Sequence, residues 1–259
     1  MLYTNHFSYQ MGATNNYGTL VLNIPHASTH VPDSLFHGER AELDKYLRQR
    51  SHFVDYFTDA LFMPDEPNES IRPVVSTVNR NICDVERLPH DPLESEGNGI
   101  MPPPFSQSCK VVLDRVKIYD YYLDYQNLLA KSLNTAHQLQ PLLIDCHSFS
   151  SSNPLIENHE KADEIDICVG FNDDFSYPGD CIVGSIIHYF ENLGYKVGCN
   201  TPFSNSKTVE TPFPYHSLML EVNKRLYMDE ATGERIHGFE HLHAAILRLS
   251  PLLLHECNP

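Results

Sequence analysis

The fold is decided by the stretch TLVLNIPH at residues 19–26, an apolar run that Pro25 stops. A second stretch of this kind, LLIDCH, stands at residues 142–147. Short apolar runs that end in turn-forming or polar residues are typical of buried strands. The two stretches therefore predict two buried strands with a histidine at the end of each, His26 in the first and His147 in the second.

Strands and helices alternate along the rest of the chain. We expect further strands at residues 72–78, 165–170, 195–199 and 217–222, and helices at 41–62 (one broken helix or two), 110–139, 181–193 and 238–254. In the 110–139 segment, apolar residues recur at Val112, Val116, Tyr119 and Leu123. Residues 88–108 hold five prolines and indicate a long loop.

This order of elements predicts an α/β fold. The expected architecture is a three-layer αβα sandwich around a mostly parallel or mixed central sheet. Because the sequence shows no internal repeat and no linker, a single domain over residues 1–259 is expected.

The chain is acidic, which excludes several kinds of partner. Its 34 acidic and 18 basic residues give a formal net charge of -16 over 259 residues. Such a field repels nucleic-acid phosphates and anionic lipids, and no run approaches the roughly 18 apolar residues that a membrane span needs. We expect neither partner. A small anionic substrate would need a local arginine or metal ion to hold it.

The cysteines and the first residues bear on the compartment. The seven cysteines form no CxxC pair, and several stand in apolar runs, which is typical of buried thiols rather than disulfides. The first fourteen residues contain no Lys or Arg and no apolar stretch of signal-peptide length. A cytoplasmic protein is expected, while the oligomeric state cannot be read from the sequence.

The two strand-end histidines are the first candidate metal ligands. In open α/β sheets, ligands gather beyond the carboxyl ends of strands, and neutral imidazole binds zinc well. A catalytic zinc site uses about three protein ligands, so a carboxylate is missing, and Asp55 or Asp59 could supply it. Asp145, on the same strand face as His147, is a candidate for orienting a histidine. Ordinary hydrogen-bonded histidines are the alternative.

Glu221 interrupts the apolar strand SLMLEVN at residues 217–223. A carboxylate there is costly unless it is paired or takes part in chemistry, and near a metal ion it could accept a proton from water. A salt bridge with Lys224 or Arg225 is the alternative. Nucleophilic serine or cysteine is disfavoured, because no G-x-S-x-G elbow occurs and Cys146 points away from the face of Asp145 and His147.

Five segments follow one another in the order of a known family. They are LVLNIPHASTHVP at residues 20–32, FVDYFTDALF at 53–62, VNRNICDVER at 78–87, LIDCHS at 143–148 and LEVNKRLYMD at 220–229. Together they resemble the N-formylglutamate amidohydrolases, over most of the chain from about residue 19 to residue 230.

The resemblance implies a zinc-dependent amide hydrolase with the broad fold of zinc carboxypeptidases and aspartoacylases. It implies zinc, or another divalent metal ion, as cofactor and an N-formyl or related N-acyl amino acid with a glutamate-like side chain as substrate. The activity of the family also points to histidine degradation.

The resemblance further implies a role for each matching residue. The metal ligands would be His26, Asp55 and His147, although Asp59 also stands in the family motif. Glu221 would be the general base, and Arg80 would stabilise the oxyanion. The residues expected to bind substrate are Arg87, Asp84, Asn200 and Asn223.

Some positions depart from the family pattern. Asn79 and Glu86 stand where the family usually has Ser and Asn, and Gln126 replaces a histidine. Glu86 is thereby expected to put an acid beside the anion-binding arginines. Because the substrate loops differ more than the metal motifs, two alternatives stay open: a zinc hydrolase of another N-acyl amino acid or small peptide, and a non-catalytic homologue that binds a small molecule.

Overall fold

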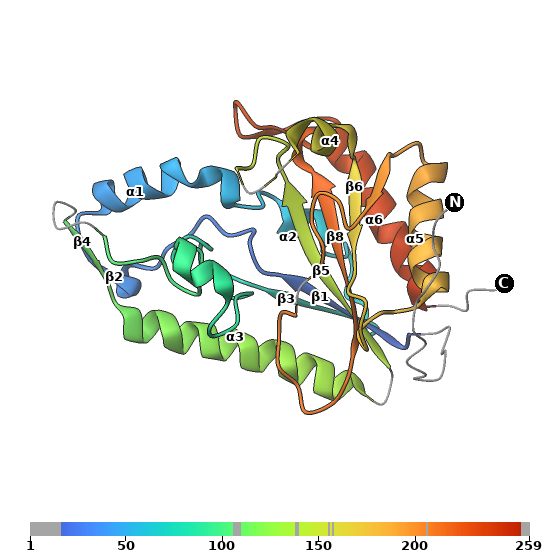
Figure 1. The fold of residues 1–259 in the computed structure, drawn as a ribbon, viewed down its shortest axis with the longest axis horizontal. Coiled ribbons are helices and arrows are strands. Elements are labelled where there is room, and N and C mark those ends of the chain that lie inside the picture. Colours follow the sequence, from blue (N-terminus) through green and yellow to red (C-terminus); the bar gives the residue numbers. More distant parts are fainter. Residues whose placement is uncertain are drawn as a thin grey trace.

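A computed structural model describes residues 17–105, 110–137, 140–154, 156, 158–205 and 207–254. Its centre is a six-stranded sheet in the order β3-β1-β5-β8-β6-β7 (Figure 1). The strands are β1 (Thr19–Ile24), β3 (Ile71–Val75), β5 (Pro141–Phe149), β6 (Ile167–Gly170), β7 (Val197–Cys199) and β8 (His216–Asn223). All neighbours run parallel except β6 and β8, which are antiparallel, so the sheet is mixed, as expected.

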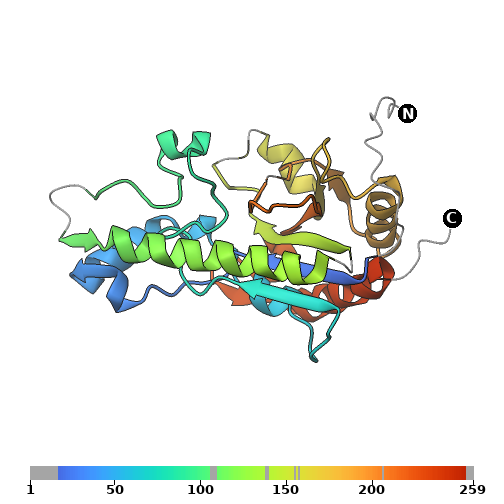
Figure 2. The ribbon, with the colours of Figure 1, turned by 90° about the horizontal axis from the view of Figure 1, so that it is seen from below.

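Helices cover both faces of this sheet. On one face α2 (Thr58–Phe62), α5 (Asp180–Asn192) and α6 (Gly238–Leu254) contact one another and the strands, and on the other α3 (Arg115–Ala136) lies along β1, β3 and β5 (Figures 1 and 2). The strand side chains alternate between two cores, since Leu142, Ile144 and Cys146 pack toward α5 and α6 while Leu143 packs toward α3. The expected three-layer α/β architecture is confirmed.

Shorter elements surround the sandwich, and the sequence did not indicate all of them. Strands β2 (Phe36–Gly38) and β4 (Val111–Leu113) pair antiparallel beside α1 (Arg40–Gln49), at the left of Figure 1. A second small sheet joins β9 (Met228–Asp229) to β10 (Glu234–Arg235). The remaining elements are α4 (His159–Glu164) and the 3-10 turns η1 (Asp33–Leu35), η2 (Ser51–Phe53), η3 (Pro92–Glu96) and η5 (Lys224–Leu226).

The expectation of one broken helix or two at residues 41–62 is confirmed, because α1 ends at Gln49 and α2 begins only at Thr58. The helix expected at residues 110–139 is α3, which begins only at Arg115, exposes Val116, Tyr119 and Leu123 and buries another set of side chains. None of the helices in the described ranges is long and apolar enough to cross a membrane.

The cysteines are only partly as expected. Cys83, Cys146 and Cys168 are buried free thiols, whereas Cys181 is exposed and Cys199 is half-buried. Cys109 and Cys257 lie outside the described residues.

Candidate metal centre

The carboxyl ends of three neighbouring strands bring the centre together. His26 follows β1, His147 lies near the end of β5, and Glu221 is its register partner on β8. Asp55 comes from the break between α1 and α2, where its backbone N–H donates to the His26 carbonyl oxygen at 3.0 Å. Four residues that are far apart in the sequence therefore meet at one edge of the sheet.

Three of these side chains point one atom each at a common position. His26 Nδ1 lies 3.2 Å from His147 Nδ1, His147 Nδ1 lies 3.0 Å from Asp55 Oδ2, and Asp55 Oδ2 lies 3.6 Å from His26 Nδ1. All three residues are buried. Two ring nitrogens this close, with a carboxylate oxygen beside them, need a shared proton or a cation between them.

These atoms fit a divalent metal ion. Nitrogen and oxygen ligands about 2.0–2.1 Å from a tetrahedral zinc ion stand about 3.4 Å apart, close to the separations in this cluster. Two imidazoles and one carboxylate are also the kind of donor set that zinc uses in hydrolases. The structure thus brings Asp55 to the histidines, while Asp59 is exposed at the start of α2.

The outer nitrogens of both histidines contact carboxylates. His26 Nε2 lies 2.8 Å from Asp84 Oδ1, and His147 Nε2 lies 2.9 Å from Glu86 Oε1. Asp84 and Glu86 belong to the segment after β3, and both are buried. Each imidazole therefore spans from a carboxylate at Nε2 to the common position at Nδ1.

The electrostatics of the cluster follow from burial and pairing. Burial alone would raise the pKa of Asp55, but hydrogen bonds from His147 and His26 outweigh it and hold the pKa below its usual range. Burial would likewise lower the pKa of His147, but Glu86 and Asp55 raise it well above its usual value. A cation that binds to Nδ1 must therefore displace protons from the cluster.

Glu221 has the environment of a proton-transfer group. Burial raises the pKa of its carboxyl to about 8, with His147 opposing this effect and Asp55 adding to it. Its Oε2 is buried and has no hydrogen-bond partner. The alternative salt bridges are not formed, because Lys224 Nζ donates to the His52 and Val54 carbonyl oxygens and Arg225 pairs with Asp166.

Asp145 does not orient His147 as the sequence suggested. Its Oδ1 accepts a hydrogen bond of 2.7 Å from Asn23 Nδ2, and the Asn23 amide oxygen accepts one from the Tyr125 hydroxyl. Burial, with Glu86 adding to it, raises the pKa of Asp145 to about 7. The carboxylate that contacts the outer nitrogen of His147 is Glu86 instead.

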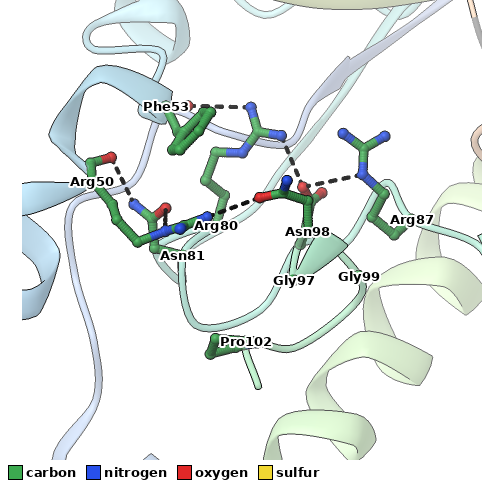
Figure 3. A pocket seen from close by; sticks show the side chains of 10 residues that line it. Arg50, Phe53, Arg80, Asn81, Arg87, Gly97, Asn98, Gly99 and Pro102 are labelled. Atoms are coloured by element: carbon green, nitrogen blue, oxygen red, sulfur yellow. Dashed lines mark hydrogen bonds and ion pairs between the residues drawn. The ribbon is translucent and has the colours of Figure 1, made fainter. Parts of the chain in front are cut away.

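Beside the cluster lies a pocket with three arginines (Figure 3). It has about 360 Å³ of empty space, counting the part open to solvent, and its charged lining residues are Arg50, Arg80, Arg87 and Asp84. Its lining carries three positive charges against one negative in a chain of net charge -16, although Asp55 and Glu86 also act on Arg80 from the adjoining cluster. This is the local reversal of charge that a small anion would need.

The arginines of this pocket differ in how fully they are bonded. Arg80 donates to the Phe53 carbonyl oxygen at 3.1 Å and to Asp84 Oδ2 at 2.8 Å. Arg87 lies only in ion-pair range of the same carboxylate, with Nε 3.6 Å from Asp84 Oδ2, and this Nε has no hydrogen-bond partner. Arg87 thus keeps donors for a ligand, while Asp84 joins the pocket to His26.

Two predicted substrate-binding residues bond backbone groups. Asn200 Oδ1 accepts from the backbone N–H of Phe171, and Asn223 Nδ2 donates to the Ile165 carbonyl oxygen. Both side chains thereby hold backbone segments around β6. Their role toward substrate stays a prediction.

Sequence reasoning missed the role of several residues that hold the centre in place. Lys224 is buried, and its bonds to the His52 and Val54 carbonyl oxygens fix the segment that leads into Asp55. Gln126 Nε2 donates to the Val85 and Thr208 carbonyl oxygens, at 2.6 and 2.9 Å, and so holds the segment between Asp84 and Glu86. The position of Lys224 directly after an apolar strand was the only available signal.

Comparison with known proteins identifies the family. The sequence model of FGase, the N-formylglutamate amidohydrolases, matches residues 18–228. The chain belongs to this family. Membership indicates a hydrolase that acts on a small molecule, and it confirms the resemblance found in the five sequence segments. No curated protein matches the chain significantly.

Solved structures agree on the fold of this family member. The crystal structure of N-formylglutamate amidohydrolase from Ralstonia eutropha JMP134 shares 20% sequence identity and a TM-score of 0.67, with 92% of each chain covered. That of the gene product Atu2144 from Agrobacterium tumefaciens shares 16% identity and a TM-score of 0.55, covering 92% of this chain and 93% of the other. At these identities the likeness extends to the fold.

Proposed function

We propose that this chain is a metal-dependent amidohydrolase that removes the formyl or a related acyl group from an acidic, glutamate-like N-acyl amino acid. The observation that carries the proposal is the cluster of His26, His147 and Asp55, whose ligand atoms are 3.0–3.6 Å apart. The carboxyl of Glu221, on the neighbouring strand, has no hydrogen-bond partner at Oε2 and supplies the proton-transfer group.

Each residue has a stated task in this reaction. A divalent ion held by His26, Asp55 and His147 would polarise the amide carbonyl and lower the pKa of a water from 15.7 toward roughly 7. Glu221 accepts the proton of the attacking water and returns it to the departing amine. Arg80 stabilises the negative charge that develops on the carbonyl oxygen.

The substrate is held by its carboxylate. Arg87 has a rigid fork of donors suited to a bidentate grip, and its Nε has no protein hydrogen-bond partner. The lining of the surrounding pocket carries three positive charges against one negative, which favours an acidic N-acyl amino acid over a neutral one.

The test is hydrolysis by protein stripped with a chelator and then reloaded with zinc, cobalt or manganese. We expect the reloaded protein to release formate from N-formyl-L-glutamate and the stripped protein to be inactive. A panel of N-acetyl-L-glutamate, N-formyl-L-glutamine and short peptides separates the substrate classes. Loss of activity on removal of the side-chain carboxylate supports a glutamate-like substrate, while equal activity on neutral analogues refutes it.

If the chain is instead a non-catalytic homologue that binds a small molecule, the same experiments should give different results. The departures in the substrate loops motivate this alternative. Such a protein would bind N-formyl-L-glutamate with the same affinity before and after metal removal and would cleave none of the panel.

A further inference from the structure

Glu86 occupies the outer side of His147. Its Oε1 lies 2.9 Å from His147 Nε2, while Nδ1 of the same ring lies 3.0 Å from Asp55 Oδ2. The two side chains are almost fully buried, with side-chain exposures of 8% and 5%. The ring is therefore held at both nitrogens, and only Nδ1 faces the candidate metal position.

The arrangement repeats at the other histidine. His26 Nε2 lies 2.8 Å from Asp84 Oδ1, and its Nδ1 faces Nδ1 of His147 at 3.2 Å. Asp84 and Glu86 are two residues apart on one segment. A single short stretch of chain thus contacts the outer nitrogen of both candidate ligands.

We propose that Glu86 is the positioning residue of His147. It accepts the Nε2–H of the imidazole and so holds the ring with Nδ1 turned toward Asp55 and His26. An anionic acceptor at the outer nitrogen also strengthens the imidazole as a ligand. This inference rests on the proposed metal site and concerns how that site is assembled.

The segment that carries Glu86 is itself fixed. The Gln126 side chain donates to the Val85 carbonyl oxygen at 2.6 Å, and the Glu86 backbone N–H donates to Asp84 Oδ1 at 3.2 Å. Because this backbone is already fixed, the Glu86 side chain loses little conformational entropy when it bonds the His147 ring. These bonds are what a positioning residue requires.

Two other roles fit the geometry less well. Glu86 does not line the arginine pocket, and although its charge acts on Arg80 and Arg87, its carboxylate bonds His147. If Glu86 were itself a metal ligand, the ion would lie on the Nε2 side of the rings, where Glu86 Oε2 lies 3.6 Å from His26 Nε2. The Nδ1 atoms, together with Asp55, face the opposite way.

The test measures metal affinity in Glu86→Gln and Glu86→Ala by competition with a chromophoric chelator. We expect Glu86→Ala to weaken zinc binding about 10- to 100-fold, the usual effect of losing such a partner. Glu86→Gln keeps an acceptor oxygen and should lose less. The visible spectrum of the cobalt-loaded protein should change with Glu86→Ala, because the ring is released.

The matched control is Asp166→Asn, a buried carboxyl that pairs with Arg225 and belongs to none of the possible ligand clusters among the described residues. Its zinc affinity should stay within about threefold of wild type. Circular dichroism of the metal-free variants checks that each one folds. If Glu86→Ala does not fold, the zinc affinity of Glu86→Gln is the test.

Three outcomes would overturn the inference. Unchanged zinc affinity in a folded Glu86→Ala variant refutes positioning, and a raised KM alone would then assign Glu86 to substrate. Losses in both variants as large as that of Asp55→Asn would make Glu86 a ligand. If the wild type itself bound no metal, the proposed function would fail as well, so the wild-type titration distinguishes the two failures.

Discussion

Glu221 is a buried carboxyl whose protonation is balanced near neutrality. Burial raises its pKa to about 8, and Oε2 has no hydrogen-bond partner. Because its strand position faces His147 across β5 and β8, it lies next to the candidate metal position. A catalytic acid or base works best with a pKa near the working pH, which is what this environment provides.

Glu221→Gln should therefore separate chemistry from metal binding. The amide is close in size but cannot accept a proton, so kcat should fall about 10²- to 10⁴-fold. Steady-state kinetics on the zinc-loaded variant measure this loss. Zinc affinity should change little, and a variant with full kcat would exclude Glu221 as the base.

The choice between two neighbouring acids gives a second prediction. Asp55 Oδ2 contacts both histidines, whereas Asp59 is exposed on α2. Asp55→Asn should weaken zinc binding by at least about 10-fold, and Asp59→Asn should leave it unchanged. Chelator competition measures both. The opposite ranking would show that the metal site is assembled differently.

At the residue scale the sequence predicted which side chains meet better than it predicted the residues that support them. His26, His147 and Glu221 stand out because a polar residue at or inside an apolar strand is unusual. The sequence could not show whether Asp55 or Asp59 meets the histidines, because that depends on where the helix is interrupted. Glu86 was expected beside the arginines, and its charge does act on Arg80 and Arg87, but a one-dimensional pattern does not show that its side chain also bonds His147.

Helix α3 supports the candidate metal centre through two of its side chains. Its Tyr125 hydroxyl bonds Asn23, and its Gln126 amide holds the segment between Asp84 and Glu86 through the Val85 carbonyl oxygen. A single helix thus braces β1 and the segment that carries both outer carboxylates. Gln126, which stands where the family usually has a histidine, therefore has a structural role in this chain.

Gln126→Leu tests this brace. It removes the donor to two carbonyl oxygens, of Val85 and Thr208, and should lower the free energy of unfolding by about 1–3 kcal/mol. The control is Asn127→Leu, an exposed neighbour on the same helix, expected within about 0.5 kcal/mol of wild type. Urea unfolding of the metal-free proteins gives both values. Equal stabilities would contradict the brace.

At the element scale the order of strands and helices was predictable, but the buried face of α3 was not. Apolar residues occur on both sides of this helix. The structure buries Ile118, Tyr122, Tyr125, Leu129 and Leu133 and leaves Val116, Tyr119 and Leu123 exposed. The spacing of the apolar residues alone could not show which side of α3 is buried, because tyrosine is compatible with a buried and with an exposed side. The two-residue strands β9 and β10 are too short to leave a pattern.

For the whole molecule, the buried carboxyl groups make stability depend on pH. Glu221 has a folded pKa of about 8, against about 4.3 for an unfolded glutamate. Between these values the folded state binds more protons. The stability that Glu221 contributes is therefore full below about pH 4.3 and is lost as the pH rises toward 8.

The metal-free protein should accordingly be less stable at pH 8 than at pH 5. Glu221→Gln removes one of the groups responsible, so its stability should fall less over the same interval. Urea midpoints at the two pH values measure the difference. Parallel pH profiles for wild type and variant would show that Glu221 is not perturbed by burial.

The roles proposed for all these residues depend on one metal ion per molecule, held by His26, Asp55 and His147. The most direct measurement is elemental analysis of zinc-loaded, dialysed protein, with and without His26→Ala and His147→Ala together. Both samples should carry His237→Gln and His241→Gln, because this exposed pair, with ring centroids 4.9 Å apart, could bind zinc at the surface. We predict one zinc per chain with the cluster intact and none without it. No zinc in the first sample, or equal zinc in both, would contradict the account.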